Sequence, residues 1–252
     1  MTYEVLAVRF GEWRTTKSAI YHSYGTYQQP DGPVDITYYV WLLRGNDRTI
    51  LVDTGFRPEI ARKRGRTPLT PVPDALASVG VTPGDITDVV LTHFHYDHIG
   101  NVHLFPDARI VAGAAEYHFW TGETGRRPLF AQAVEADEVA AVAAAEKQRR
   151  LTLGDPGIPG LTLTDLPGHT PGQVVVEVDT AAGRVILASD ASHTYEEFES
   201  DLPFHIASDL PAMYDGLAWL RKAATDSIVV PGHDPDVLNR YPKVGDHAVR
   251  IA

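Results

Sequence analysis

Residues 88–100 read DVVLTHFHYDHIG, an apolar run that leads directly into side chains able to bind a metal ion. The apolar part, 88–91, has the composition and length of a buried β-strand. The metal-binding side chains are those of His93, His95, Asp97 and His98. At the composition of this chain, an H-x-H-x-D-H pattern arises by chance with a probability on the order of 0.002. The stretch therefore predicts a metal site where a buried strand ends.

The spacing separates the four side chains into two pairs. In an extended or turning segment, His93 and His95 project to the same side and can chelate one ion. Asp97 and His98 lie past the turn and can reach a second ion, and we expect a helix that begins near Ile99 to fix this turn. Four neighbouring residues cannot enclose two cations, so two or three further ligands must come from elsewhere in the chain.

Three other predicted strands end in the same way, with a small residue and then a metal-binding side chain. The strands are 161–166, 184–188 and 227–230, and the side chains that follow them are those of His169, Asp190 and His233. Ligands in α/β proteins bind outside the carboxyl ends of strands. Each of these residues alone could be an ordinary turn residue, but all three at strand ends favour one shared site.

Strand patterns alternate with helical patterns along the rest of the chain. Further strands are expected at 3–10, 36–44, 49–52, 109–112 and 173–178. Helices are expected from a Thr70-Pro71 start to Gly80, over 130–150, and behind a Ser208/Asp209 cap with Leu210, Met213, Leu217 and Leu220 on one face. The alternation predicts an α/β protein with one domain over 1–252, and four layers with two sheets inside suit its length.

The composition excludes several classes of protein. The chain has 252 residues, a formal charge of -11, 11 His and no Cys. Without Cys there is no disulfide scaffold, thiolate zinc site, iron-sulfur cluster or cysteine nucleophile. The acidic balance argues against nucleic acid or an anionic membrane as the main partner. No apolar run approaches a membrane span and the N-terminus does not read as a signal peptide, so we expect a soluble, cytoplasmic protein.

Taken together, these motifs resemble those of the metallo-β-lactamase superfamily. The matching segments are LVDTG at 51–55, HFHYDH at 93–98, GH at 168–169, Asp190, and PGH at 231–233, in the order of the family. The resemblance implies an αββα sandwich whose two halves meet at a dinuclear metal site. His93, His95 and His169 would bind one ion, Asp97, His98 and His233 would bind the other, and Asp190 would bridge them. Asp53 would brace the ligand loops without binding metal.

Within the superfamily, the chain looks most like the N-acyl homoserine lactonase group, whose members act in quorum quenching. The similar segments are ILVDTG at 50–55, THFHYDHIGN at 92–101, LPGHTPGQ at 166–173 and SDASHTYEEFE at 189–199. In that group a Tyr three residues after the bridging Asp contacts the substrate carbonyl, and here that position is His193, with Tyr195 two residues further on. The substrate stays open between such a lactone and another small lactone, ester or cyclic amide.

The expected mechanism is attack on a lactone by hydroxide held between two cations. Two cations would lower the pKa of a bridging water to near neutrality. Asp97 would accept the proton of this water and pass it to the leaving alkoxide, and His193 or Tyr195 would donate a hydrogen bond to the developing oxyanion. Zn²⁺ is the first expectation for the metal, with Mn, Co and Fe as alternatives that suit the same ligands.

Other readings of the same residues remain. The chain could hydrolyse a thioester or phosphodiester, although a charge of -11 does not supply the basic surface usual in nucleases. A metal-binding protein without turnover is disfavoured by Asp97 and the complete ligand set, and electron transfer is disfavoured because His95 stands where flavodiiron proteins carry Glu. No G-x-S-x-G, P-loop or G-x-G-x-x-G motif occurs, so serine catalysis and nucleotide cofactors are not indicated. The expected partner is a small-molecule substrate, and a homodimer is compatible with the sequence.

Overall fold

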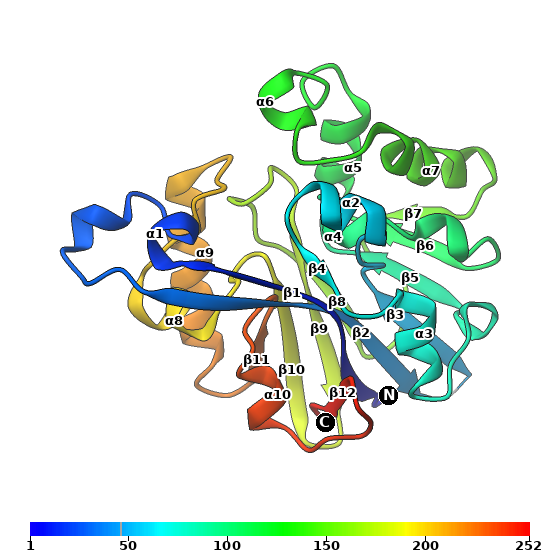
Figure 1. Cartoon of the computed structure of the whole chain (residues 1–252). Coiled ribbons are helices and arrows are strands. Elements are labelled where there is room, and N and C mark those ends of the chain that lie inside the picture. The colour runs from blue at the N-terminus through cyan, green and yellow to red at the C-terminus, as the bar shows by residue number, and fades with distance from the viewer. Residues whose placement is uncertain (46) are drawn as a thin grey trace.

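The computed structural model describes residues 1–45 and 47–252, and it confirms the expected α/β architecture. Two β-sheets form the middle of the molecule, with α8 (Tyr195–Ser200) and α9 (Leu210–Ala223) on one side and α3 (Val72–Ala77), α4 (Tyr96–Ile99) and α7 (Ala136–Lys147) on the other (Figure 1). This is the four-layer αββα sandwich that the sequence implies.

In the described residues, the first sheet has eight strands in the order β12-β1-β2-β3-β5-β6-β7, with β4 paired to β1. The strands are β1 (Glu4–Thr16), β2 (Pro33–Gly45), β3 (Arg48–Val52), β4 (Thr67–Pro68), β5 (Asp88–Leu91), β6 (Arg109–Ala112), β7 (Leu151–Leu153) and β12 (Ala248–Arg250). The pairs from β3 to β7 are parallel. The carboxyl ends of β3 and β5 therefore lie at the same edge of the sheet.

The second sheet has four strands in the order β11-β10-β9-β8. They are β8 (Leu161–Asp165), β9 (Val174–Thr180), β10 (Gly183–Ser189) and β11 (Ile228–Pro231). β9 is antiparallel to β8 and to β10, whereas β10 and β11 are parallel. β8, β10 and β11 consequently run in one direction and end at one edge, as a shared site requires.

The apolar run of β2 shows how the sheets are buried. Tyr39 and Trp41 belong to the apolar cluster between the sheets, together with residues of the second sheet such as Val176. Val40 and Leu42 belong to the cluster under the helices of the first sheet. Because side chains of a strand alternate between its faces, a strand covered on both faces must be apolar throughout.

The remaining helical elements are short. They are α1 (Lys17–Ile20), α2 (Pro58–Lys63), α5 (Ala114–Thr121), α6 (Pro128–Ala131), α10 (Val237–Arg240) and the 3-10 turns η1 (Tyr24–Tyr27), η2 (Pro83–Asp85) and η3 (Val102–Leu104). Of the helices described, none is long and apolar enough to cross a membrane.

The helix predictions were right in part. The helix with Leu210, Met213, Leu217 and Leu220 is α9, and the Asp209 side chain caps it by accepting from the Ala212 N–H. The helix expected at the Thr70-Pro71 start begins one residue later, at Val72, without a side-chain cap.

Two other helix predictions were wrong. The single helix expected over 130–150 is two helices, α6 and α7, because the Arg64 guanidinium binds the carbonyl oxygens of Gln132 and Val134 between them. The helix expected to begin near Ile99 is α4, which ends there instead.

Candidate metal centre

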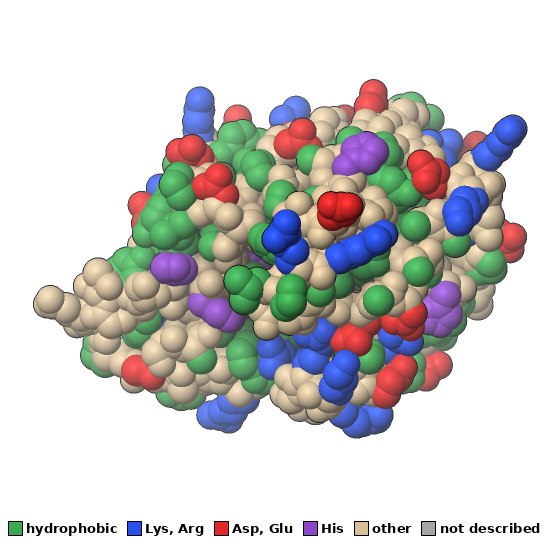
Figure 2. All heavy atoms as spheres, turned by 90° about the horizontal axis from the view of Figure 1, so that it is seen from above, with side chains coloured by type: hydrophobic (Ala, Val, Ile, Leu, Met, Phe, Trp, Pro, Cys, Tyr) green, Lys and Arg blue, Asp and Glu red, His purple; other side chains and the backbone are tan. Residues whose placement is uncertain are grey.

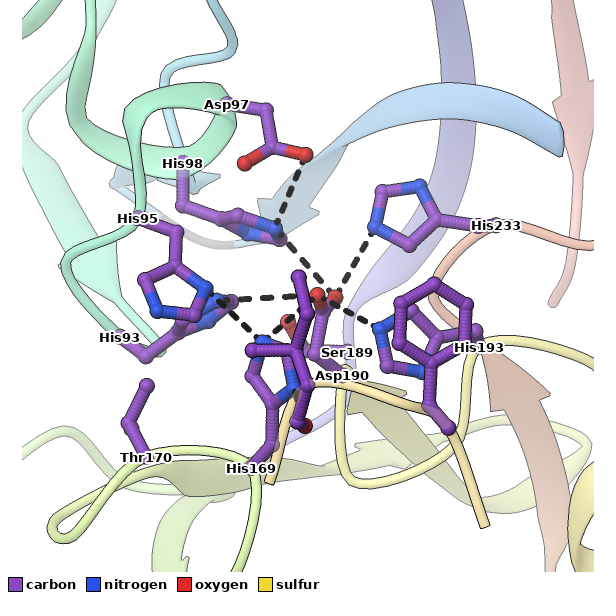
Figure 3. A network of polar contacts seen from close by, with 12 residues as sticks. His93, His95, Asp97, His98, His169, Thr170, Ser189, Asp190, His193 and His233 are labelled. Carbon is purple, nitrogen blue, oxygen red and sulfur yellow. Dashed lines mark hydrogen bonds and ion pairs between the residues drawn. The ribbon is translucent and has the colours of Figure 1, made fainter. Parts of the chain in front are cut away.

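The predicted ligands come together from the ends of four strands and are all buried. The loop after β5 carries His93 and His95, and α4 carries Asp97 and His98. His169, Asp190 and His233 follow β8, β10 and β11, respectively. Figure 3 shows Asp190 in the middle of the group, with the six other side chains around it.

The ligand atoms form two sets. His93, His95, His169 and Asp190 place one atom each within 4.8 Å of one another, and Asp97, His98 and His233 form a second such set. This is the division that the family resemblance implies, with Asp190 found beside the first set.

The two carboxylate oxygens of Asp190 face different sets. Oδ2 lies 3.2 Å from Nε2 of His169 and 3.7 Å from Nε2 of His93. Oδ1 lies 2.9 Å from Nε2 of His233 and 3.3 Å from Nε2 of His98. A carboxylate in this position can bind one cation through each oxygen.

The nitrogen atoms of the cluster suit a metal better than they suit one another. Among the described residues, Nε2 of His93 and Nε2 of His98 are buried and have no hydrogen-bond partner. Burial lowers the pKa of His93 and His95 far below the ordinary value, and neighbouring imidazoles lower it further. Neutral imidazoles with free lone pairs are the form that binds metal.

The carboxylates create a site for positive charge. Although burial opposes ionisation, the surrounding imidazoles, His193 first, hold the pKa of Asp190 well below its ordinary value. Burial also opposes a charged His98, yet Asp190, Asp53 and Asp97 raise the pKa of that imidazole. The donor set and its field therefore fit divalent cations bound by nitrogen and oxygen.

Asp53 has the bracing position expected of it. Its Oδ1 accepts from the Thr92 N–H at 2.8 Å, and its Oδ2 accepts from Thr92 Oγ1 and from His98 Nδ1, both at 2.8 Å. The bond to Nδ1 leaves Nε2 of His98 facing the cluster. Gly55 turns the chain behind this brace with φ +68°, where a Cβ would lie 2.8 Å from Phe10 and Val72.

Two other ligands are oriented by backbone carbonyls. Nδ1 of His169 donates to the Ile206 oxygen at 2.9 Å, and Nδ1 of His233 donates to the Thr37 oxygen at 3.1 Å. In both rings, Nε2 is the nitrogen left for the cluster.

Glu116 of α5 links the ligand loops, and the sequence analysis missed it. The carboxylate accepts from the Phe94 N–H at 2.8 Å on the loop of His93 and His95. It also accepts from Thr170 Oγ1 at 2.8 Å and the Gly172 N–H at 3.1 Å, beyond His169. Burial raises the pKa of Glu116 to about 7. In the sequence, Glu116 could have been noticed as the one acidic residue in the mostly apolar stretch VAGAAEYHFW at 111–120.

The structure brings His193 to the cluster. Its Nε2 lies 3.0 Å from Oδ2 of Asp190, its Nδ1 donates to Glu197 at 3.1 Å, and its ring stacks on Phe204 at 3.5 Å. Burial disfavours a charged His193, but Asp190 and Glu197 raise its pKa to about 9. Glu197 was missed in the sequence because its side chain turns inward only once α8 has formed.

The structure does not bring Tyr195 to the cluster. Its ring lies 3.5 Å from the Arg240 guanidinium, and it lines a separate cavity with Arg240 and Tyr241. The second candidate for the hydrogen bond to the substrate is therefore remote from the metal ligands.

A cavity of about 690 Å³ opens onto the ligands. Its floor includes His95, Asp97, His169, Asp190 and His233. Its walls include Trp13, Tyr38, Phe204, His205, Leu129 and Arg66. Seen from above, the molecule carries hydrophobic and charged side chains close together near the centre (Figure 2).

Comparisons with known proteins agree with this geometry. The family model described as Metallo-beta-lactamase superfamily matches residues 35–233. An N-acyl homoserine lactonase of Bacillus sp is 28% identical over 197 residues, which are 69% of this chain and 72% of the relative. N-acyl homoserine lactonase AiiB of Agrobacterium fabrum (strain C58 / ATCC 33970) is 28% identical over 226 residues, 77% of this chain and 79% of the relative.

Solved structures share the fold over nearly the whole chain. A quorum-quenching N-acyl homoserine lactone lactonase has a TM-score of 0.77 at 23% identity, and 97% of this chain and 98% of that chain are covered. AidC, a dizinc quorum-quenching lactonase in complex with a product, has a TM-score of 0.74 at 22% identity, with 92% and 88% covered. With the family match over most of its length, this chain is a metal-dependent hydrolase that belongs to the metallo-β-lactamase superfamily.

Proposed function

We propose that this hydrolase opens the ring of a lactone, an N-acyl homoserine lactone or a similar small lactone, with two divalent metal ions in its site. The observation that carries the proposal is the position of Asp190, whose two oxygens face two separate sets of ligands. The lactonases among the similar proteins support the choice of a lactone as substrate.

The seven ligands would divide between the two ions. His93, His95 and His169 would hold one ion, Asp97, His98 and His233 the other, and Asp190 would contact both. Zn²⁺ is the first candidate, and Mn, Co and Fe suit the same nitrogen and oxygen donors. When bound, the cations would supply a water of lowered pKa and would polarise the lactone carbonyl.

Asp97 would act as the general base and then the general acid of the reaction. It lines the cavity, and its Oδ2 lies 3.9 Å from Nε2 of His98. From this position its carboxylate can accept the proton of the attacking water and return it to the alkoxide that leaves when the ring opens.

His193 would bind the carbonyl oxygen. Glu197 accepts from Nδ1 and the stacked Phe204 holds the ring, so that Nε2 faces Asp190 and the cavity. Nε2 would donate to the oxyanion in the doubly protonated ring, the form that the raised pKa of about 9 favours. A hydrogen bond to the developing oxyanion contributes about 3 kcal/mol in comparable enzymes. Tyr195 is not part of this proposal. The cytoplasmic location and the homodimer stay predictions.

The test is a pH-stat screen of the metal-loaded protein against lactones, esters, amides and phosphodiesters, with metal content measured by elemental analysis. We expect acid release from lactones and two metal equivalents per chain. The Asp97→Asn variant should lose turnover by about a hundredfold or more while its substrate affinity changes far less. Cleavage of phosphodiesters alone would overturn the proposal.

A further inference from the structure

The cavity above the metal ligands differs in charge from the rest of the chain. Among the described residues that line it, the only carboxylates are Asp97 and Asp190, and both are metal ligands of the proposed site. Apart from its histidines, the other ionic side chains of the lining are the guanidinium groups of Arg64 and Arg66. A chain with a formal charge of -11 thus places two cationic side chains where its substrate must enter.

Arg64 has structural partners of its own. Its guanidinium forms an ion pair with Glu135 at 2.7 Å and donates to the carbonyl oxygens of Gln132 and Val134. It also lies 4.2 Å from the centre of the Tyr96 ring. These contacts hold the segment between α6 and α7, so Arg64 has little capacity left for a ligand.

Arg66 is held in place by neutral groups. Its Nε donates to the Tyr96 hydroxyl at 3.3 Å, and its Nη1 donates to the Arg64 carbonyl oxygen at 2.8 Å. Its guanidinium carbon lies 3.7 Å from the centre of the Trp13 ring. In the part of the chain that the structure describes, no carboxylate forms an ion pair with it. A guanidinium carries five N–H donors, so several remain for a ligand.

The surroundings of Arg66 favour an anion over a plain acyl chain. The Trp13 face and the Tyr96 hydroxyl fix the planar guanidinium before a ligand arrives, which reduces the entropy lost on binding. Asp97 is near enough to act on the charge of Arg66, but the cations of the proposed site would neutralise this carboxylate. The planar fork of a guanidinium matches a carboxylate with two parallel hydrogen bonds.

We propose that Arg66 binds a carboxylate carried by the substrate, so that the enzyme acts on lactones with an anionic substituent. This inference deepens the proposed function and rests on it. The lactone ring would lie over the metal ligands, and the carboxylate would lie against the wall formed by Arg66 and Trp13. A neutral acyl chain would instead leave the charge of Arg66 without a counter-ion in a half-buried position.

The experiment compares two lactones of equal length, one whose side chain ends in a methyl group and one whose side chain ends in a carboxylate. Values of kcat and KM are measured with the metal-loaded wild type and with Arg66→Gln, Arg66→Lys and Arg62→Gln. Arg62 is the matched control because it is exposed on α2 and does not line the cavity.

We expect the wild type to prefer the carboxylated lactone in kcat/KM by about tenfold or more, the size of one charged hydrogen bond. Arg66→Gln should abolish this preference through KM, Arg66→Lys should retain part of it, and Arg62→Gln should retain all of it. Metal content and the Tm of each variant, compared with those of the wild type, show that the variants are folded. The preference should also weaken as salt concentration rises.

Two outcomes would overturn the inference, and they differ from failure of the proposed function. Equal or better turnover of the methyl lactone by the wild type would show that the site does not select an anion. An identical preference in Arg66→Gln and Arg62→Gln would show that Arg66 is not the group that selects it. Failure to hydrolyse either lactone, with both metal equivalents present, would instead contradict the lactonase proposal itself.

Discussion

His193 illustrates how a single side chain acquires its function from its neighbours. Residues 193 and 195 are both near Asp190 in the sequence, and both carry a donor that could reach a carbonyl oxygen. Only His193 is turned inward, because Glu197 accepts its Nδ1 proton and Phe204 covers its ring. Tyr195 is buried elsewhere, with its ring against the Arg240 guanidinium. The choice between them was open in the sequence and depends on the start of α8.

This difference predicts the effects of two substitutions. His193→Phe should lower kcat/KM on a lactone by about a hundredfold, because a donor to the oxyanion contributes about 3 kcal/mol. Tyr195→Phe should stay within about twofold of the wild type, since its hydroxyl is remote from the cavity. Steady-state kinetics on both variants checks this. A fully active His193→Phe together with an inactive Tyr195→Phe would show that the donor is the tyrosine.

The candidate metal ligands could be predicted from the sequence, and so could the brace Asp53, whereas Glu116 and Glu197 could not. His93 and His95 belong to a local pattern, and Asp190 and His233 follow apolar strands whose direction sets where they meet. Glu116 could not be placed in this way, because three of its bonds reach two loops that are far apart in the sequence and adjacent only in the fold. A buried acid acts through tertiary contacts, which a linear pattern does not encode.

At the scale of elements, the length of an apolar run decided which strands were predictable. β5 and β6 have the bounds expected from the sequence, since each is an apolar run covered on both faces. β4, β7 and β12 were missed because they are two or three residues long and pair only at the margins of the sheet. Such strands are specified by the neighbour they pair with, and their own composition carries little signal.

The attachment of α7 to α2 contains a buried acid that should make stability depend on pH. Glu138 of α7 accepts from Arg57 Nε at 3.0 Å through Oε1, while its buried Oε2 has no partner among the described residues. Burial raises the pKa of Glu138 to about 7, and Arg57 offsets only part of the rise. The folded protein therefore favours the protonated carboxyl. This stabilisation is complete below the ordinary pKa of 4.5 and is lost as pH rises through about 7.

Glu138→Gln, which imitates the protonated carboxyl, should remove this pH dependence. The wild type loses stability between pH 4.5 and pH 8 and the variant does not. The difference in the free energy of unfolding, variant minus wild type, should therefore grow over this range, by about 3 kcal/mol at most. Urea unfolding of both proteins at several pH values measures the difference. Asp137→Asn is the control, because Asp137 also pairs with Arg57 but its side chain is 67% exposed. A wild type and Glu138→Gln that differ by the same amount at every pH would contradict the prediction.

At the scale of the whole molecule, the proposed metal ions would join the two sheets. The first sheet supplies the ligands that follow β5, and the second sheet supplies His169, Asp190 and His233. The 3.3 Å distance between Oδ1 of Asp190 and Nε2 of His98 joins a ligand of the second sheet to one of the first. Cations bound here would therefore stabilise the packing of the two halves as well as the site, and they would bind the folded chain far better than the unfolded chain.

Removal of metal should consequently lower the Tm. At free metal about a thousandfold above its Kd, binding adds about 4 kcal/mol to the free energy of unfolding, which corresponds to about 10 °C in a chain of this size. Calorimetry before and after chelation, and again after Zn²⁺ is restored, measures the shift and its reversibility. Asp190→Ala should bind fewer than two equivalents and show a smaller shift, because one carboxylate faces both sets of ligands. Two retained equivalents and an undiminished shift in Asp190→Ala would show that this carboxylate does not bridge the ions.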